Sequence, residues 1–219
     1  MTTCTFVMRA ASVATPSTDA RYEYRVWPRR APPIVPALQR GWLPTAAERR
    51  ADIYLLCPNS SNVTVKLRDG CKLEIKQRGH DYGDLAHWRV ALSENFPLSP
   101  SALGQLASAL LMPQSLPQTA CLSPAHLLAA LSRPSAGPEI LIVRKSRLSF
   151  RRQGCRAEIT RVVWENHVCL TIALEDADPD QARRAVNALG LGRWPNRSYG
   201  DALRTRPLLI MAPIQPHDI

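Results

Sequence analysis

Cations at nearly every second residue mark the stretch NVTVKLRDGCKLEIKQR, residues 62–78. Apolar residues fill the positions between them, and this alternation has the period of a β-strand with one apolar and one polar face. An Asp-Gly pair divides the stretch and predicts a hairpin turn. The chain must therefore place a whole face of Lys and Arg, interrupted only by Glu74, either in water or around an anion.

The apolar residues set the expected register of this hairpin. A two-residue loop at the Asp-Gly pair would place charge opposite hydrocarbon, whereas a three-residue loop over residues 68–70, with a left-handed glycine, restores the match. This loop predicts that Val65 faces Leu73 and that Val63 faces Ile75. The polar face then carries Lys66, Lys72, Glu74 and Lys76. Neighbouring like charges destabilise a strand pair unless an anion or a carboxylate lies between them.

A three-stranded meander is predicted in the second half, from the segments IVRKSRLSF, CRAEITRVV and HVCLTIALED. Two-residue turns at residues 153–154 and 165–166 keep the faces in step. Ser149 then pairs with Glu158, and Glu158 pairs with Ala173 on the next strand. The three strands therefore agree on one polar and one apolar face.

The remaining segments predict one domain from residue 21 to residue 206. Strands are expected at residues 21–27, 52–57 and 86–92. Helical spacing of apolar residues within 99–133 indicates a helical insertion, and its two helices start at Ser-Pro pairs. A further amphipathic helix is expected over 180–189, and all these helices should pack on the apolar sides of strands, outside the sheet. Residues 1–20 are expected to form a disordered leader and residues 207–219 a tail.

Charge and cysteine usage narrow the classes of function. The formal net charge of +10 and the pI near 9.8 imply attraction to polyanions. No run of 18 apolar residues occurs, so a membrane-spanning helix is not expected. The N-terminal apolar patch has no basic region before it and is a poor secretory signal. The six cysteines form no CxxC pair, which fits a reduced, cytoplasmic setting.

The direction of the polar faces decides between two architectures. A β-sandwich would bury the apolar faces and leave the cations in water. However, a surface made only for solubility mixes both signs more evenly than these faces do. Their carboxylates stand singly among many cations, as Glu23, Glu74, Glu158 and Glu175. If the helices cover the outer side of a curved sheet, the cations line a lumen, which needs a bound polyanion, water and carboxylates to offset the repulsion.

The order of the motifs along the chain resembles that of the CYTH, or triphosphate tunnel metalloenzyme, superfamily, from Tyr22 to Leu203. The motifs are Glu23-x-Arg25, Asp52-x-Tyr54, Lys66-x-Arg68, Leu73 to Lys76, Lys145-x-Arg147, Glu158 within A-E-I-T, Glu175 closing I-A-L-E, Leu189 to Leu191, and Arg197 to Leu203. The resemblance implies an α+β fold: an antiparallel eight-stranded β-barrel, or tunnel, with helices packed on the outside.

The resemblance also implies a ligand and a site. The ligand would be a triphosphate, a nucleotide or a polyphosphate, held by Arg25, Lys66, Arg68, Lys76, Arg78, Lys145, Arg147 and Arg151. A divalent metal, Mg²⁺ or Mn²⁺, would be held by Glu23, Glu158 and Glu175. The sequence departs from the family pattern at Arg21 and Ala173, where the family has carboxylates.

Three functions follow. The first is a metal-dependent phosphohydrolase of the triphosphatase type, in which the metal and the cations stabilise the transferring phosphoryl group. The second is a catalytically reduced module that binds polyphosphate or a phosphorylated metabolite, which the lost carboxylates favour. Nucleic-acid binding by an exposed cationic sheet has the weakest support, because aromatic residues do not interleave with the cations.

Overall fold

The computed structural model describes residues 20–29, 32–58, 60–112, 116, 123–132 and 137–205. The expected leader, apart from residue 20, and the whole expected tail lie outside the described residues.

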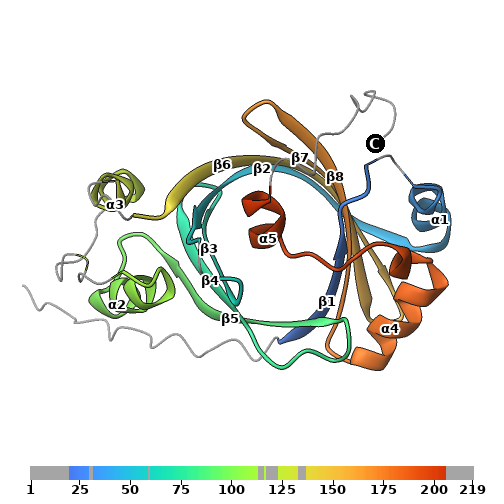
Figure 1. Ribbon diagram of the computed structural model, residues 1–219. Helices are drawn as coiled ribbons and strands as arrows, with labels where there is room; N and C mark the ends of the chain where they lie inside the picture. Colours follow the sequence, from blue (N-terminus) through green and yellow to red (C-terminus); the bar gives the residue numbers. More distant parts are fainter. Residues whose placement is uncertain are drawn as a thin grey trace, which may run out of the picture.

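The strands of the described chain are β1 (Arg21–Val26), β2 (Leu43–Leu56), β3 (Val63–Arg68), β4 (Lys72–Arg78), β5 (Ala86–Asn95), β6 (Glu139–Arg152), β7 (Cys155–Trp164) and β8 (His167–Asp176). They form a closed antiparallel barrel in the order β1-β5-β4-β3-β2-β6-β7-β8, and β8 pairs back to β1 (Figure 1). The predicted α+β class and eight-stranded antiparallel barrel are confirmed.

The helices of the described chain are α1 (Ile34–Gly41), α2 (Pro100–Ala109), α3 (Pro124–Leu131), α4 (Pro179–Ala188) and α5 (Tyr199–Arg204), with a 3₁₀ turn η1 at Leu191–Arg193. Both Ser-Pro start signals act as N-caps. Ser99 Oγ accepts a hydrogen bond from the Ala102 amide at 3.1 Å, and Ser123 Oγ accepts one from the His126 amide at 3.2 Å. Within the described residues, no helix combines the length and apolarity needed to cross a membrane.

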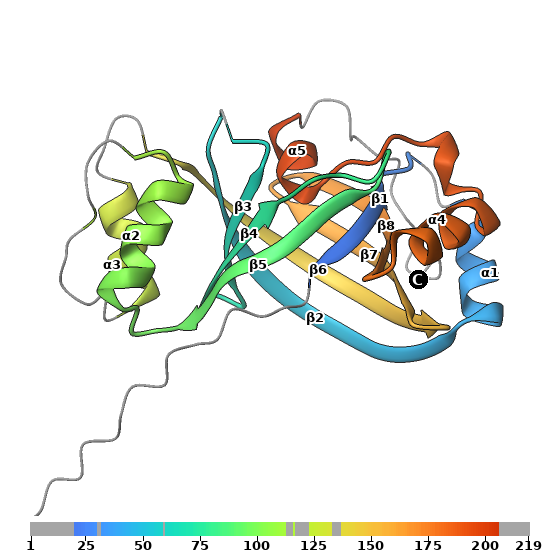
Figure 2. The same cartoon turned by 90° about the horizontal axis from the view of Figure 1, so that it is seen from below.

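Four helices cover the outer wall of the barrel, as predicted for three of them, α2, α3 and α4. Leu106 of α2 and Leu131 of α3 pack in one apolar cluster with Leu67 of β3. Val186 of α4 packs with Ile172 of β8 in a second cluster, to which α1 also contributes. Figure 2 shows α2 and α3 on one side of the barrel and α1 and α4 on the other. The apolar faces of the strands therefore point outward, to the helices, and the polar faces point inward.

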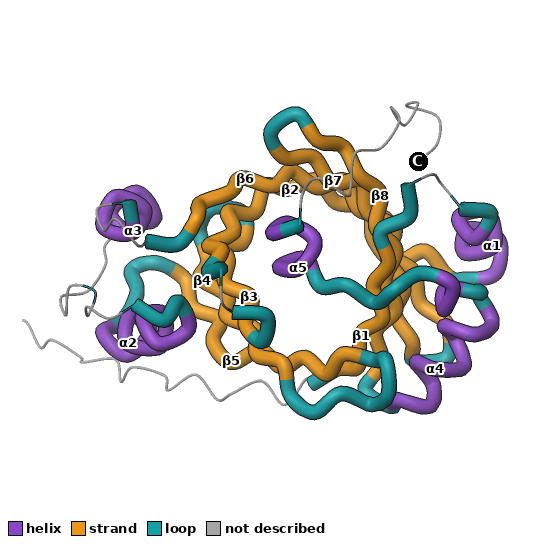
Figure 3. Tube along the Cα trace, in the orientation of Figure 1, coloured by secondary structure: helices purple, strands orange, loops and turns teal. Residues whose placement is uncertain are grey.

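Helix α5 is placed differently. Figures 1 and 3 show it within the outline of the ring of strands, and Figure 2 shows it at one end of the barrel. Its residues Tyr199, Ala202 and Leu203 are buried in a third apolar cluster with Trp27 and Tyr54. This helix lies across one opening of the tunnel and brings an aromatic ring to the lumen.

The β3–β4 hairpin has the predicted loop length, but the loop lies one residue further along the chain, so each residue of β3 pairs with a β4 residue two positions beyond the predicted one. Val65 pairs with Ile75 and Leu67 with Leu73, so the expected pairing of Val65 with Leu73 is wrong. The loop spans residues 69–71, with the left-handed conformation at both Asp69 (φ 52°) and Gly70 (φ 68°). Both registers match apolar residues, but the observed one sets Lys66 directly opposite Glu74. Their ion pair of 2.9 Å replaces the like-charge pairing of Lys66 with Lys72 in the predicted register, while Arg68 now lies opposite Lys72.

The predicted meander of β6, β7 and β8 is confirmed residue by residue. Ser149 pairs with Glu158, and Glu158 pairs with Ala173. The turn after β6 has the left-handed conformation at Gln153 (φ 49°) and Gly154 (φ 88°), as a two-residue hairpin turn requires.

Strand β2 is much longer than expected. The sequence predicted a strand at 52–57, whereas β2 starts at Leu43 and pairs with β6 along its length. Its first half, LPTAAERR, lacks the alternation of apolar and polar residues that indicates a strand. The register shifts between Pro44 and Ala46, where a bulge accommodates the missing proline N–H.

Candidate functional site

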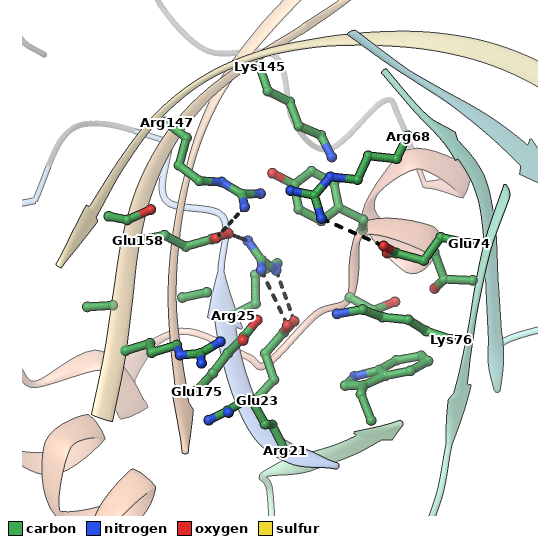
Figure 4. A pocket seen from close by; sticks show the side chains of 18 of the residues that line it. Arg21, Glu23, Arg25, Arg68, Glu74, Lys76, Lys145, Arg147, Glu158 and Glu175 are labelled. Carbon is green, nitrogen blue, oxygen red and sulfur yellow. Dashed lines mark hydrogen bonds and ion pairs between the residues drawn. The ribbon is translucent and has the colours of Figure 1, made fainter. Parts of the chain in front are cut away.

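A cavity of about 550 Å³ occupies the barrel interior. Among the described residues, ten cationic side chains line it, but only four carboxylates do. The cations are Arg21, Arg25, Arg50, Lys66, Arg68, Lys76, Lys145, Arg147, Arg151 and Arg156. The carboxylates are Glu23, Glu74, Glu158 and Glu175. Figure 4 shows side chains from opposite walls converging on this space.

Seven of the eight cations predicted to contact phosphate line this cavity, and so do all three predicted metal-binding glutamates. Arg78 is the exception. It lies at the end of β4, where its guanidinium pairs with Asp81 instead of lining the cavity. Arg78 lies two residues after Lys76 and belongs to the same face of the strand. However, Asp81 in the turn that follows is close enough to pair with its side chain.

Arg25 lies at the centre of the charged cluster. Its Nε and Nη2 donate hydrogen bonds to the two oxygens of Glu23 at 3.0 and 3.3 Å, and its Nη1 donates to Glu158 Oε1 at 2.7 Å. Arg147 Nη1 lies 3.1 Å from the other oxygen of Glu158. Burial would raise the pKa of Glu158, but Arg147 and Arg25 outweigh burial and hold that pKa well below its usual range. Glu158 is therefore a carboxylate at neutral pH.

Glu175 has different surroundings. It lies directly opposite Glu23 on the neighbouring strand, and both side chains point into the cavity (Figure 4). Burial raises the pKa of Glu175 to about 7, and the charges of Glu23 and Glu158 add to this rise while Lys76 opposes it. The cavity therefore holds one carboxyl group whose charge changes near neutral pH.

The end of the tunnel near α5 holds a second cluster, centred on Lys145. Its Nζ donates hydrogen bonds of 2.7 Å to Asp52 Oδ2 and to the Tyr54 hydroxyl, and it lies 4.0 Å from the centre of the Tyr199 ring. Burial lowers the pKa of Lys145 well below its ordinary value, and Lys66 adds to this fall while Asp52 opposes it. Asp52 also lies within ion-pair distance of Arg50 and Lys66.

The sequence alone predicts no role for several residues of this second cluster. Asp52 and Tyr54 form a D-x-Y motif whose alternation places both side chains on one strand face. Tyr199 reaches the cavity only through the path of α5, which no local pattern predicts. Arg50 was missed because the first half of β2 was missed.

At the opposite end of the tunnel, arginines face one another. Arg151 and Arg156 are exposed and form a cross-strand pair next to the β6–β7 turn. Arg21 lines the same cavity beside Trp88, its partner on β5. Like charges directly opposite each other destabilise a strand pair, so this end is stabilised when an anion lies between them.

The donor set does not fit the divalent metal that the resemblance implies. Mg²⁺ requires near-octahedral coordination by oxygen atoms. All four oxygens of Glu23 and Glu158 already contact guanidinium groups, while Arg21 and Ala173 offer no oxygen from their side chains. Among the described residues, no group of three or more His, Cys, Asp or Glu side chains is arranged to hold a metal ion.

Comparison with known proteins gives structural neighbours. No family model and no curated protein matches the sequence. A conserved hypothetical protein from Pyrococcus furiosus is 12% identical, with a TM-score of 0.51 over 82% of this chain and 97% of its own. A putative adenylyl cyclase from Hippeastrum, whose structure is described as revealing a dominant triphosphatase activity, is 13% identical, with a TM-score of 0.48 over 90% of this chain and 98% of its own. A putative adenylate cyclase from Bacillus halodurans is 11% identical, with a TM-score of 0.46 over 84% of this chain and 96% of its own.

The first of these similarities establishes the fold and nothing further. The chain shares its fold with that protein, and the closed eight-stranded antiparallel barrel is the architecture that the sequence resemblance implies.

Proposed function

We propose that this protein binds a linear anion of the triphosphate or polyphosphate type inside its tunnel. The observation that carries the proposal concerns the described part of the chain, where ten Lys and Arg side chains and only four carboxylates converge on one cavity within a closed barrel. Such an excess of positive charge around one cavity is stabilised when anions and water offset the repulsion. Arginine forks bind phosphate oxygens in a bidentate manner, which suits this ligand class.

The arrangement along β6 supports an extended ligand. Lys145, Arg147 and Arg151 line the cavity from one strand. At a rise of about 3.3 Å per residue, these cations form a row of roughly 20 Å. A single phosphate or sulfate would contact only part of this row, whereas a chain of phosphates would contact more of it. The cations face the inside of the barrel, whereas nucleic-acid binding was expected to use an exposed sheet.

Calorimetric titration with inorganic triphosphate, pyrophosphate, phosphate and sulfate tests this proposal. Triphosphate is expected to bind most tightly, and Arg151→Ala to weaken its binding about tenfold, equivalent to about 1.4 kcal/mol. Arg183→Ala is the matched control, because it removes the same charge from α4, where Arg183 pairs with Asp84. Equal affinity for sulfate and triphosphate, or equal losses in the two variants, would contradict the proposal.

Hydrolysis of the bound triphosphate is a second candidate, and Glu175 favours it. A carboxyl group with a pKa of about 7 is suited to proton transfer at neutral pH. The metal-dependent form that the resemblance implies, with Mg²⁺ or Mn²⁺, would require Glu23 and Glu158 to release their guanidinium partners. Phosphate release from inorganic triphosphate and from ATP, measured with Mg²⁺, with Mn²⁺ and with chelator, separates the cases. Release in none of these conditions would leave binding alone.

A further inference from the structure

Two carboxylates of the tunnel are neutralised by a residue of the chain itself. Arg25 is 3% exposed and bridges Glu23 of its own strand and Glu158 of β7. With Arg147 on the remaining oxygen, each oxygen of the two carboxylates contacts one guanidinium nitrogen. Figure 4 shows the Arg25 guanidinium between the two carboxylates, with dashed lines to both.

We infer that Arg25 acts as a built-in cation in the position where a divalent metal would join Glu23 and Glu158, so that the tunnel takes up its anion free of metal. This inference rests on the proposed function and specifies its ligand: the uncomplexed anion, not its complex with Mg²⁺ or Mn²⁺.

The chemistry of guanidinium supports this role. An arginine side chain has five N–H donors, and the contacts with Glu23 and Glu158 use three of them. Two donors therefore remain for a phosphate oxygen, and Arg25 lines the cavity. One side chain can thus neutralise the carboxylates and also contact the ligand, which are two roles of a bridging metal.

Displacement of Arg25 by a metal ion is unfavourable for two reasons. The guanidinium is buried, and a buried charge that loses its partners is strongly destabilising. Moreover, Glu74 is not free to receive the guanidinium, since it is already paired with Lys66 at 2.9 Å. A divalent ion would also approach a wall on which cations outnumber carboxylates.

The direct test is titration with Mn²⁺ alone, followed by electron paramagnetic resonance. The wild-type protein is expected to leave Mn²⁺ free at concentrations at which Arg25→Ala binds it, with affinities that differ by at least about tenfold. Arg151→Ala is the matched control, because it also removes one cation from the cavity but leaves Glu23 and Glu158 paired; it should not bind Mn²⁺. Tight Mn²⁺ binding by the wild-type protein would overturn the inference.

Titration with triphosphate gives a second readout. The wild-type protein should bind inorganic triphosphate at least as tightly in chelator as in Mg²⁺, whereas stimulation of its affinity by Mg²⁺ of tenfold or more would overturn the inference. Arg25→Lys covers the case in which Arg25→Ala does not fold: it keeps the charge but loses the fork, so it should bind Mn²⁺ no better than wild type and triphosphate more weakly. Failure of triphosphate binding in every condition would remove the proposed function, while the Mn²⁺ comparison would still decide the role of Arg25.

Discussion

Lys145 and Asp52 form the most deeply buried ion pair of the described tunnel, with Nζ and Oδ2 2.7 Å apart and side-chain exposures of 2% and 0%. Each is on a different long strand, so the pair fixes how β2 and β6 present their polar faces. Arg50 and Lys66 also approach Asp52, which makes this carboxylate the shared counter-ion of three cations.

Asp52→Asn is therefore expected to destabilise the fold strongly. Breaking a buried pair leaves an uncompensated buried charge, which costs about 3–5 kcal/mol. The charges of Lys145 and Lys66 outweigh burial and depress the pKa of Asp52, so its contribution is present above its unfolded pKa of about 3.9 and is lost as the pH falls below that value. Urea unfolding at pH 7 and pH 3 measures both effects. Asp84→Asn is the control, because it breaks the exposed pair with Arg183; it should lower the free energy of unfolding by no more than about 1 kcal/mol. Similar losses of stability in the two variants would disprove the role of Asp52.

Tyr199 is expected to hold α5 across the opening. Its ring lies 4.0 Å from Lys145 Nζ and 4.5 Å from the Arg25 guanidinium carbon, and the side chain is buried. Tyr199→Ala should lower the free energy of unfolding by about 3 kcal/mol, through lost packing and lost cation–π contacts. Tyr199→Phe keeps the ring and should stay within about 1 kcal/mol of wild type in urea unfolding. A stable Tyr199→Ala variant would mean that α5 is held by other contacts.

Affinity for triphosphate is expected to rise as the pH falls from 8 to 6. Burial raises the pKa of Glu175 to about 7, so below that pH the cavity loses one negative charge. Glu175→Gln should remove this part of the pH dependence and bind about tenfold more tightly than wild type at pH 8. Calorimetry on both proteins at each pH measures these affinities. Protonation of triphosphate itself affects both proteins equally, so it cancels when their affinities are compared.

The raised pKa of Glu175 also predicts how the stability of the protein changes with pH. Since the folded-state pKa of Glu175 lies above its ordinary value of 4.5, its contribution to stability falls as the pH rises from about 4.5 to 7. Glu175→Gln should therefore gain melting temperature relative to wild type at pH 8 but not at pH 4. An equal shift at both pH values would argue against a raised pKa.

Two glycine substitutions should have opposite effects on stability. Gly70 has a φ of 68° in the β3–β4 loop, so Gly70→Ala strains the backbone by about 1 kcal/mol although nothing lies within 4 Å of the added methyl group. Gly104 lies inside α2 with the same open space, and Gly104→Ala should stabilise the protein by about 0.5–1 kcal/mol. Urea unfolding of both variants tests the left-handed loop, and a neutral Gly70→Ala would count against it.

The sequence was sufficient where side-chain alternation was strong. The register of β6, β7 and β8 followed from matching faces across two short turns, and the inward direction of the cations followed from the apolar surface that the helices need. The hairpin of β3 and β4 was predicted two residues out of register, because two registers that differ by two residues both match its apolar residues. The ion pair of Lys66 with Glu74 distinguishes the two registers. It is a contact between two strands, which the residue pattern of neither strand predicts.

Other parts of the site depend on relationships between distant segments. Arg25 was predicted to bind phosphate, but its bridge from Glu23 to Glu158 needs the closure of the barrel between β1 and β8. Tyr199 enters the lumen because α5 turns back across the barrel, and no periodicity records this path. Arg78 does not line the cavity as predicted, because its guanidinium pairs with Asp81, three residues along the chain.

The pairing of β1 with β8 has a consequence for synthesis of the chain. Glu23 and Glu175 are neighbours in the barrel, yet nearly the whole domain separates them in sequence. Contacts between such distant residues form late and slowly, because the loop entropy must be paid before they add stability. On a ribosome, β1 must wait for β8 to emerge before the ring can close, so its charged face gains its partners on β7 and β8 only when nearly all of the domain has been made.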